Sequence, residues 1–501
     1  MISIPVLTPA EIRAVEERAA RFGAPSLMER AGRAVAQAAI KLAPDTGAPI
    51  LVVAGPGNNG GDAWVAAAHL AESFYRIVVL DVSGAAPKAV EARTAKEGFE
   101  SRKGQVVRAW PSGLAPALIV DGLLGLGLTR AVDAAFGEII GRMNASGVPI
   151  LAIDVPSGLD GGSGLARGCA VRATCTITFL AHKIGLHTAE GLECRGELEL
   201  DDLGAGDEVR REAKGLLLTP AFVAPWLAPR HANSHKGDYG SVAVIGGNRG
   251  MVGAALLAAR AALLCGAGKV RTGLLASEAP AVDLLRPELM LSSIDDALES
   301  EVIVAGPGAG QSPSSTSVSM FERTVIPALI ASTKPVVFDA DALNAIAFNG
   351  TLETDLAGRT KAPTILTPHP AEAARMLHRK TAQVNEDRLG SALALAKRFN
   401  AQVVLKGAGS ICAFPDGRWS VNSTGNPGLS AAGSGDVLAG MIGAMLAQGL
   451  DAEKALQYAV CLHGAAADAC VARAVGPVGL TATEIALEAR DVLNRWIRDR
   501  K

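Results

Sequence analysis

The chain has 501 residues, of which 49% are hydrophobic and only 4% aromatic, and it contains 56 glycines. This length predicts two or more domains, and the composition is typical of a folded α/β protein with glycine-rich loops rather than of a disordered chain. Because 48 basic residues nearly balance 50 acidic ones, the net charge does not indicate binding to nucleic acid or to an anionic membrane.

The N-terminal segment and the cysteines indicate a cytoplasmic protein. Acidic residues come early in this segment and no apolar core follows, so we expect no signal peptide. The strongly apolar stretch 251–268 is interrupted by Arg260, so no transmembrane span is expected. The seven cysteines are scattered without a Cys-x-x-Cys pair. This pattern favours a reducing compartment, buried thiols and no zinc site.

The first part of the chain predicts two helices followed by alternating strands and helices. Helices are expected at 8–21 and 26–42, because Thr8 with Glu11 and Ser26 with Glu29 have the spacing of a capping box. A strand at 49–54 then runs through the glycine loop GPGNNGGD into a helix. Further strands are expected at 76–82, 117–120, 149–153, 175–180 and 197–200, and further helices at 87–103 and 132–144.

This alternation predicts a Rossmann-like α/β/α sandwich, in which ligands bind at the carboxyl ends of parallel strands. Asn59, Asp121 and Ser157 follow three of these strands and offer an amide oxygen, a carboxylate and a hydroxyl. Such hard oxygen ligands suit potassium or a similar cation rather than zinc, and the glycines beside Asn58 and at 125–127 suit backbone contacts to phosphate. Alternatively, 58–62 is an ordinary turn and the strand-end aspartates cap neighbouring loops.

The charged segment 201–214 is predicted to be a linker or a connecting segment, so we place the two domains at 1–214 and 215–501. The strand pattern then restarts at 241–245, 302–305, 335–338, 364–366 and 402–405. Each strand runs into a polar or glycine-rich loop, and these loops read GGNRGMVGA, GPGAG, DADALN, TPHPAE and KGAGS. The C-terminal part is therefore predicted to be a second α/β domain.

The sequence GSGD at 433–436 directly precedes an apolar helix candidate. Free N–H groups at such a helix start attract phosphate. Asp436 would accept a proton there, or alternatively it merely caps the helix. Lys406 is either a phosphate ligand or a solvated surface lysine. His369, which stands between two prolines and near Glu372, is either a site residue or a structural one.

These motifs together resemble a known family. KGDYGSVAVIGG, GPGAG, DADALN, TPHPAE, KGAGS and NSTGNPGLSAAGSGD resemble the NAD(P)H-hydrate dehydratase branch of the ribokinase-like superfamily. LMERAG, GPGNNGGD, DGLLGLGL and DVPSGLDG resemble the NAD(P)H-hydrate epimerase domain. In this order they resemble the bifunctional NAD(P)H-hydrate repair enzymes over nearly the whole chain.

Three positions depart from the family patterns. His369 begins the run His-Pro-Ala-Glu where kinases of the superfamily usually carry Asn-x-x-Glu, which argues against an ordinary kinase. Ala63 replaces a glycine that is common after GNNGGD, and Leu126 stands where a threonine is frequent. The last two changes leave the backbone amides in place.

For the N-terminal domain, the resemblance implies interconversion of the R and S epimers of hydrated NADH or NADPH, with potassium held by Asn59, Asp121 and Ser157. Asp154 is the expected acid–base group, and Lys183 is a second candidate. The substrate-binding residues that the resemblance implies are Asn58, Asn59, Gly60, Gly61, Asp62, Gly125, Leu126, Gly127, Leu128, Thr129, Arg130, Ala131 and Asp154.

For the C-terminal, ribokinase-like domain, the resemblance implies dehydration of the S epimer with ADP and Mg²⁺, giving AMP and phosphate. Asp436 would accept the proton of the C6 hydroxyl. Ala254, Gly308, His369 and Asp436 would bind the hydrate, and Lys406, Gly407, Ala408, Gly409, Ser410 and Gly435 would bind the nucleotide. We also expect a homo-oligomer with no nucleic-acid or membrane partner.

Two alternative hypotheses compete with the repair function that the resemblance implies. The chain could be a vitamin or sugar kinase fused to a dinucleotide-binding regulatory domain, against which the missing Asn at 369 and the presence of GNNGGD both argue. Alternatively, the N-terminal domain could be a dinucleotide sensor without catalytic activity, against which Asp154 and Lys183 argue.

Overall fold

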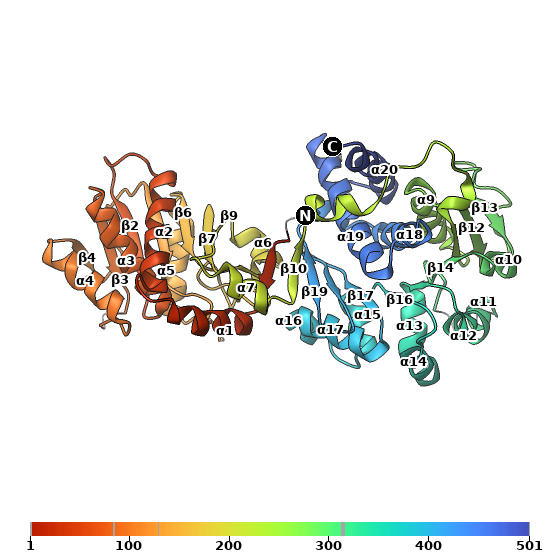
Figure 1. Cartoon of the computed structure of the whole chain (residues 1–501), viewed down its shortest axis with the longest axis horizontal. Coiled ribbons are helices and arrows are strands. Elements are labelled where there is room, and N and C mark those ends of the chain that lie inside the picture. The colour runs from red at the N-terminus through yellow and green to blue at the C-terminus, as the bar shows by residue number, and fades with distance from the viewer. Residues whose placement is uncertain (1–2, 84–85, 129, 312–315, 500–501) are drawn as a thin grey trace. The chain divides into compact units, whose positions relative to one another are not determined.

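The structure is a computed structural model, and it describes residues 3–83, 86–128, 130–311 and 316–499. The chain divides into two compact units. The N-terminal unit comprises Pro5–Gly215, and the C-terminal unit comprises the described residues from Leu216 onward together with Ser3 and Ile4. In Figure 1 the N-terminal unit runs from red to yellow-green and the C-terminal unit from green to blue.

The N-terminal unit contains a sheet of seven parallel strands in the order β4-β3-β2-β5-β6-β7-β9. The strands are β2 (Ile50–Ala54), β3 (Ile77–Asp81), β4 (Gln105–Val107), β5 (Leu118–Gly122), β6 (Ile150–Ile153), β7 (Cys175–Phe179) and β9 (Glu197–Asp201). A separate short pair joins β1 (Pro5–Leu7) to β8 (His182–Lys183). The helices are α1 (Pro9–Ala19), α2 (Leu27–Leu42), α3 (Asn58–Glu72), α4 (Val90–Ser101), α5 (Ala134–Ala145), α6 (Gly191–Cys194) and α7 (Gly206–Glu212).

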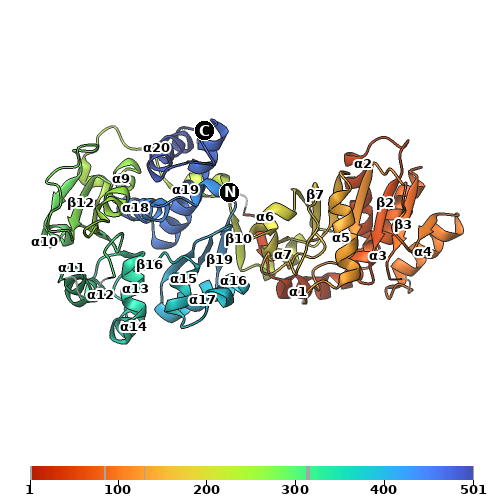
Figure 2. The same ribbon diagram turned by 180° about the vertical axis from the view of Figure 1, so that it is seen from behind.

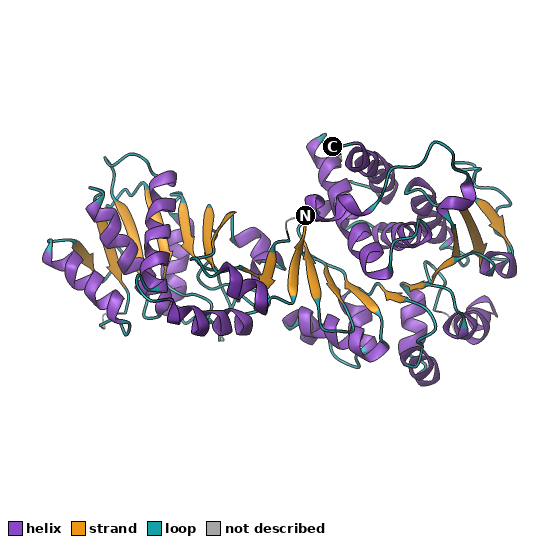
Figure 3. Cartoon of the chain, in the orientation of Figure 1, coloured by secondary structure: helices purple, strands orange, loops and turns teal. Residues whose placement is uncertain are grey.

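Alternating side chains of each strand enter two different cores. Ile50, Val52 and Ala54 of β2 pack with α2 and α3 on one face, whereas Leu51 and Val53 pack with α5 on the other. Because both faces are covered, the strands are apolar throughout, as buried parallel strands are. Figure 3 shows the strands between the helices. The predicted α/β/α sandwich is therefore confirmed.

At two places in this unit the structure differs from what the sequence indicates. The glycine sequence after β2 is not a loop before the helix, because α3 already begins at Asn58 with Gly57 as its N-cap. The segment 201–214 is not a free linker, because it contains α7. Arg18 of α1 forms ion pairs with Glu208 and Glu212 of this segment at 2.9 and 2.8 Å, which hold it to the N-terminal unit.

The C-terminal unit contains the strand order β13-β12-β11-β14-β15-β16-β17-β18-β19-β10. Pairing is parallel from β13 to β17 and antiparallel from β17 to β19. The strands are β10 (Gly215–Leu218), β11 (Ser241–Gly246), β12 (Lys269–Leu274), β13 (Met290–Ser292), β14 (Val302–Ala305), β15 (Val336–Phe338), β16 (Thr364–Leu366), β17 (Gln402–Leu405), β18 (Ile411–Ala413) and β19 (Trp419–Asn422).

Helices cover this second sheet, and α9, α18, α19 and α20 gather on one side of it in both Figure 1 and Figure 2. They enclose a core with alternate strand residues such as Val242, Val244 and Val304. The helices are α8 (Pro220–Val223), α9 (Val252–Leu264), α10 (Ile294–Leu298), α11 (Thr316–Met320), α12 (Ile326–Ala331), α13 (Asp341–Ala347), α14 (Gly350–Ala357), α15 (Pro370–Met376), α16 (Thr381–Glu386), α17 (Arg388–Phe399), α18 (Ser434–Ala447), α19 (Ala452–Ala472) and α20 (Ala482–Arg498).

Among the described residues, α19 is the one helix long and apolar enough to cross a membrane by length and composition. Of its most apolar window, 72% is buried inside the protein, as in a core helix. All seven cysteines are free thiols, and six of them are buried.

Candidate active sites

In each unit the strand order reverses once, and polar loops meet at that point. The reversal lies between β2 and β5 in the N-terminal unit and between β11 and β14 in the C-terminal unit. Successive strands on the two sides of a reversal connect over opposite faces of a sheet, which leaves a crevice at their carboxyl ends. GPGNNGGD and DGLLGLGL lie at the first reversal, and GGNRG and GPGAG lie at the second.

The three predicted oxygen ligands of the N-terminal unit meet around Leu124. Asn59 donates from Nδ2 to the carbonyls of Leu124 and Ile153 at 2.8 and 3.0 Å. Ser157 accepts from the Leu124 N–H at 2.7 Å and donates from Oγ to Asp121 at 2.6 Å. The structure thus brings these three side chains together.

Asp121 carries a negative charge that the protein does not neutralise. Its side chain is fully buried, and it accepts hydrogen bonds from Ser157 and from the Leu123 N–H. Burial raises the pKa of Asp121 to about 6, although these hydrogen bonds oppose the shift. Among the described residues no cationic side chain pairs with it. A cation bound here by oxygen ligands would supply the missing charge.

Asp154 and Lys183 of this unit form an ion pair. Lys183 is almost fully buried, and its ammonium donates to Asp154 Oδ1, to Thr178 Oγ1 at 2.9 Å and to the Phe179 carbonyl at 2.7 Å. An ammonium has three hydrogens, so none remains for a substrate. Asp154 Oδ1 also accepts from the Phe179 N–H at 3.1 Å. The geometry makes Lys183 a group that positions Asp154.

The backbone at Asp154 is in the left-handed region, with φ at 64°. Few residues other than glycine adopt this conformation, and such strain gathers at functional sites. The Asp154 N–H donates to the Ile177 carbonyl at 2.7 Å, so the turn that aims the carboxylate is fixed from β7.

These groups border a cavity of about 810 Å³, the substrate cavity. From the predicted set it is lined by Asn58, Asn59, Asp62, Gly125, Leu126, Gly127, Leu128, Arg130, Asp154 and Lys183. Of the described residues in that set, Gly60, Gly61 and Ala131 are not part of the lining. A Cβ at Gly60 would lie 1.9 Å from the Gly55 carbonyl oxygen, so this glycine serves close packing of α3. Thr129 lies outside the described residues.

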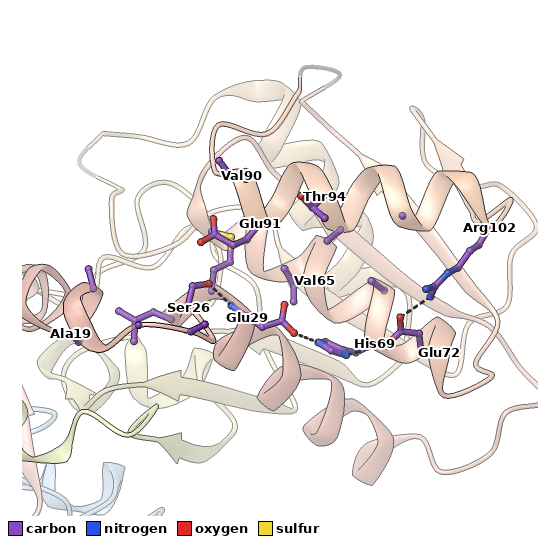
Figure 4. A pocket seen from close by; sticks show the side chains of 18 residues that line it. Ala19, Ser26, Glu29, Val65, His69, Glu72, Val90, Glu91, Thr94 and Arg102 are labelled. Atoms are coloured by element: carbon purple, nitrogen blue, oxygen red, sulfur yellow. Dashed lines mark hydrogen bonds and ion pairs between the residues drawn. The ribbon is translucent and has the colours of Figure 1, made fainter.

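A larger cavity of about 930 Å³ lies beside α3 and α4. Its polar side chains are mostly engaged with one another (Figure 4): His69 Nε2 contacts Glu29 at 2.8 Å, and Arg102 contacts Glu72 at 2.7 Å. The hydrogen bond from Arg102 lowers the pKa of Glu72 at this wall, whereas burial raises the pKa of Asp62 in the substrate cavity. The larger cavity shares Ala20, Leu27 and Met28 with the substrate cavity but contains none of the predicted site residues. We therefore place the chemistry in the smaller cavity.

In the C-terminal unit, charged residues follow three adjacent strands. Asp339 follows β15, Glu372 lies on α15 after β16, and Lys406 follows β17. The Lys406 ammonium donates to Asp339 Oδ1 at 3.0 Å, and Thr367 donates to the same oxygen at 2.6 Å. Burial disfavours the ammonium, but the charges of Asp339, Glu372 and Asp436 outweigh it and raise the pKa of Lys406.

Asp436 is the third residue of α18, and it does not cap that helix. The N-cap is Gly433, with φ at 85° and no side-chain capping bond. Burial, then repulsion from Asp339, raises the pKa of Asp436 to about 7, while Lys406 opposes the shift. A Cβ at Gly435 would lie 3.1 Å from Lys406 Nζ. The carboxylate, the ammonium and the free N–H groups of α18 are therefore neighbours, and the capping interpretation of Asp436 is wrong.

His369 has a structural role that its sequence position left open. It is the N-cap of α15, and its Nδ1 accepts from the N–H groups of Ala371 and Glu372 at 3.1 and 3.4 Å. Glu372 completes the capping box by accepting from the His369 N–H at 2.8 Å. Nε2 lies 3.3 Å from Glu372 Oε1. Burial raises the pKa of Glu372 to about 7.

The remaining predicted residues form two groups. Gly308 has φ at 61°, and a Cβ there would lie 2.9 Å from the Ala254 side chain, so these two residues adjoin at the β11–β14 reversal. The loop 406–410, which contains Gly407, Ala408, Gly409 and Ser410, is anchored by Arg388. This buried side chain from α17 donates to the carbonyls of Leu405, Lys406 and Ala408.

Sequence reasoning missed several residues at these sites. Asp339 belongs to the recognised DADALN sequence, but only the fold shows that it pairs with Lys406. Glu16 lies in the capped first helix and gives no signal of its own, yet it lines the substrate cavity. His463 lies in an apolar helix and contacts Ser434 Oγ at 3.2 Å beneath the start of α18.

Two family models match the chain. Residues 24–185 match the YjeF-related protein N-terminus, and residues 242–489 match NAD(P)H-hydrate dehydratase. The bifunctional NAD(P)H-hydrate repair enzyme Nnr of Escherichia coli is 35% identical over 484 residues, which are 95% of this chain and 90% of that protein. The enzyme of the same name from Coxiella burnetii is 35% identical over 97% of this chain and 98% of its own length.

Among solved structures, an ADP/ATP-dependent NAD(P)H-hydrate dehydratase from Bacillus subtilis, co-crystallised with ATP and Mg²⁺, is 33% identical. It covers 56% of this chain and 98% of its own, with a TM-score of 0.48.

Proposed function

The chain belongs to the family of bifunctional NAD(P)H-hydrate repair enzymes, and we propose that each unit carries one half of the repair at its own site. The N-terminal unit interconverts R- and S-NADHX or NADPHX in the substrate cavity. The C-terminal unit dehydrates the S epimer with ADP as phosphoryl donor. The observation that carries this assignment is the cluster of Asp436, Lys406 and the start of α18.

Hydroxide is a poor leaving group, so the hydroxyl at C6 has to be activated. Asp436 takes the hydroxyl proton as the oxygen attacks the β-phosphorus of ADP, and AMP leaves. The phosphate ester then departs from C6 as the N1 lone pair forms a double bond, and loss of a C5 proton gives NADH or NADPH. N–H groups at the start of α18 and the Lys406 ammonium stabilise the transferring phosphoryl group.

Residues 406–410 hold the nucleotide through backbone groups that Arg388 fixes in place. Ala254, Gly308 and the exposed edge of His369 line the hydrate site. Mg²⁺ enters with ADP as part of the substrate, bound by phosphate oxygens and water with few protein ligands, as is usual for this ion.

In the N-terminal unit, Asp154 is the acid–base group and Lys183 positions it. Potassium is the cation that fits Asn59, Asp121 and Ser157, because the ligands are oxygens and Asp121 supplies a single negative charge. The ion would neutralise the buried Asp121 and fix the loops that carry Asn59 and Leu124.

A thermal-shift titration with KCl tests the ion site, with LiCl as the matched salt. Potassium should raise the melting temperature of the wild type and leave Asp121→Asn unchanged. Equal shifts by both salts in both proteins would contradict a potassium site.

The repair activity is tested by incubating the full chain with mixed NADHX epimers and ADP or ATP while NADH absorbance is followed. We expect complete recovery of NADH with ADP. Nucleotide consumption without recovery of NADH would favour the kinase hypothesis instead. A cytoplasmic location and a homo-oligomeric state remain predictions.

A further inference from the structure

Three carboxylates from three different elements line the substrate cavity. Glu16 comes from α1, Asp62 from the second turn of α3, and Asp154 from the turn after β6. Asp154 is held by Lys183, Thr178 and the Phe179 N–H. By contrast, Asp62 makes no hydrogen bond or ion pair among the described residues, although it is only partly exposed. Two aspartates in one cavity thus have opposite environments.

These environments act differently on the two aspartates. Burial of the carboxyl, then the negative charges of Asp154 and Glu16, raise the pKa of Asp62 well above its usual range, and Lys183 opposes this only in part. Asp154 instead forms a direct ion pair with the Lys183 ammonium. The cavity therefore places an Asp62 carboxyl without a hydrogen-bond partner among the described residues beside an Asp154 carboxylate that is paired with an ammonium. Such a difference in environment is how enzymes separate an acid from a base.

Epimerisation at C6 requires one group that donates a proton and another that accepts one. The carbon bears a hydroxyl and adjoins the ring nitrogen N1. A proton given to the hydroxyl lets the C6–O bond break with its electrons leaving on water, while the N1 lone pair forms the N1=C6 double bond. Water then attacks C6 from the opposite ring face and gives up a proton. One group must donate the first proton and another must accept the second, and no further reactant is needed.

We propose that Asp62 is a second catalytic residue of the epimerisation, which acts as acid when Asp154 acts as base and exchanges roles with it in the reverse direction. This rests on the proposed epimerase function of the cavity. Glu16 contributes through its charge on Asp62, not by touching the reacting carbon. Asp62 thus joins the reaction itself, beyond the substrate-binding role that the GNNGGD sequence predicts.

The charged groups that face Asp62 set the pH behaviour. The charges of Glu16 and Asp154 favour the protonated form of Asp62, and the charge of Lys183 favours its ionisation. Arg13 and Arg130 also line the cavity. The acid must be protonated, so the epimerisation rate should fall on the alkaline side as Asp62 loses its proton. Removal of the Glu16 charge should move this fall to lower pH.

The experiment uses the full-length enzyme without ADP, so that only epimerisation proceeds. Pure S-NADHX is converted to R-NADHX, and kcat and KM are measured across pH for the wild type, Asp62→Asn, Asp62→Glu and Glu16→Gln. We expect Asp62→Asn to lower kcat by about 10²–10⁴-fold, the usual contribution of a general acid or base, and to change KM less. The pH profile of this variant should lack the fall in rate on the alkaline side, which is called the alkaline limb below. Asp62→Glu should restore part of the rate. Asp207→Asn, an exposed change on α7, is the matched control.

Two results would overturn the proposal. One is a near-normal kcat in folded Asp62→Asn, or an effect confined to KM, either of which would leave Asp62 as a binding residue only. The other is an alkaline limb that does not move in Glu16→Gln, which remains informative if Asp62→Asn does not fold. A wild type that shows no epimerisation would instead refute the function proposed for this cavity.

Solvent labelled with ¹⁸O adds a readout of the bond that breaks. Epimerised product should carry the label at C6, because the hydroxyl leaves and returns as water. Epimerisation with full retention of the original oxygen would contradict cleavage of the C6–O bond and with it the acid role of Asp62.

Discussion

At the scale of single residues, the C-terminal site contains carboxyl groups whose ionised form the protein disfavours. Asp436 and Glu372 both have pKa values raised to about 7, first by burial and then by other charges of the same cluster. Lys406 offsets part of this repulsion through its contact with Asp339. A carboxyl whose pKa lies near the working pH is suited to accept a proton and release it again.

Asp436→Asn keeps the shape of the side chain and removes the base. We expect dehydration to slow by about 10²–10⁴-fold, while epimerisation measured without ADP persists. The wild-type rate should rise as the pH increases through about 7, because Asp436 acts when deprotonated, and the residual rate of the variant should lack this limb. Steady-state rates from pH 5 to 9 measure both effects. Near-normal turnover in a folded variant would refute the assignment.

The same substitution should stabilise the C-terminal unit at high pH. The folded-state pKa of Asp436 lies above its unfolded value, so the folded state binds more protons and loses stability as pH rises between the two values. Asn cannot ionise and avoids this loss. We expect the melting temperature to rise by about 2–4 °C at pH 8, the shift that 1 kcal/mol produces in a large domain, and the gain to shrink toward pH 5. A gain that does not depend on pH would have another cause.

At the scale of secondary-structure elements, the junction between β2 and α3 shows why glycines accumulate at the N-terminal site. The first turn of α3 passes so close to the end of β2 that Gly60 has no room for a side chain. This contact places Asn59 against the loop after β5 and the end of β6, where its amide donates to the carbonyls of Leu124 and Ile153. The position of the proposed cation ligands therefore depends on the packing of backbone against backbone.

Gly60→Ala should disrupt this junction. Its Cβ would lie 1.9 Å from the Gly55 carbonyl oxygen, and such overpacking typically costs about 1–3 kcal/mol. We expect a lower melting temperature and loss of epimerisation, measured by calorimetry and the assay without ADP. Gly141→Ala, in the middle of α5 with open space around it, is the control and should stabilise by about 0.5–1 kcal/mol. An unchanged Gly60→Ala protein would contradict the close approach.

The sequence predicted those elements whose pattern is local. Apolar strands such as 402–405 and the capped helices lie near their expected bounds, because burial of parallel strands and capping leave direct marks. β12 was missed because Lys269 and Arg271 interrupt its apolar pattern. The attachment of the segment 201–214 to the N-terminal unit was not predicted, because the partner of its charges, Arg18, lies nearly 200 residues earlier.

The same contrast between local patterns and long-range contacts applies to the candidate sites. Strand-end residues such as Asp154 and Lys406 could be predicted, because parallel strands place their carboxyl ends together. Other features depend on distances that no sequence pattern encodes. Lys183 uses all three ammonium hydrogens within the protein, and His369 caps α15. Glu16 reaches the substrate cavity from α1.

At the scale of the whole molecule, each unit has its own sheet, its own reversal of strand order and its own set of perturbed carboxylates. The substrate cavity is lined wholly by residues of the N-terminal unit. The cluster around Asp436 consists wholly of residues of the C-terminal unit. Repair of a mixed hydrate therefore requires R-NADHX to leave one site as the S epimer and enter the other.

A full-length Asp154→Asn enzyme tests this division of labour. Asp154 lies in the N-terminal unit, so the variant should dehydrate pure S-NADHX with ADP at the wild-type rate. Given an equimolar mixture of epimers, it should recover NADH quickly only to the extent of the S epimer, and the remaining R epimer should follow at the uncatalysed rate of epimerisation. The wild type should recover both epimers in one continuous phase, and adding the Asp436→Asn enzyme to the stalled reaction should restart it, because that protein keeps an intact N-terminal site. If Asp154→Asn instead slows dehydration of pure S-NADHX, or if the two variants together do not restore full recovery, then the two sites do not act as independent catalysts.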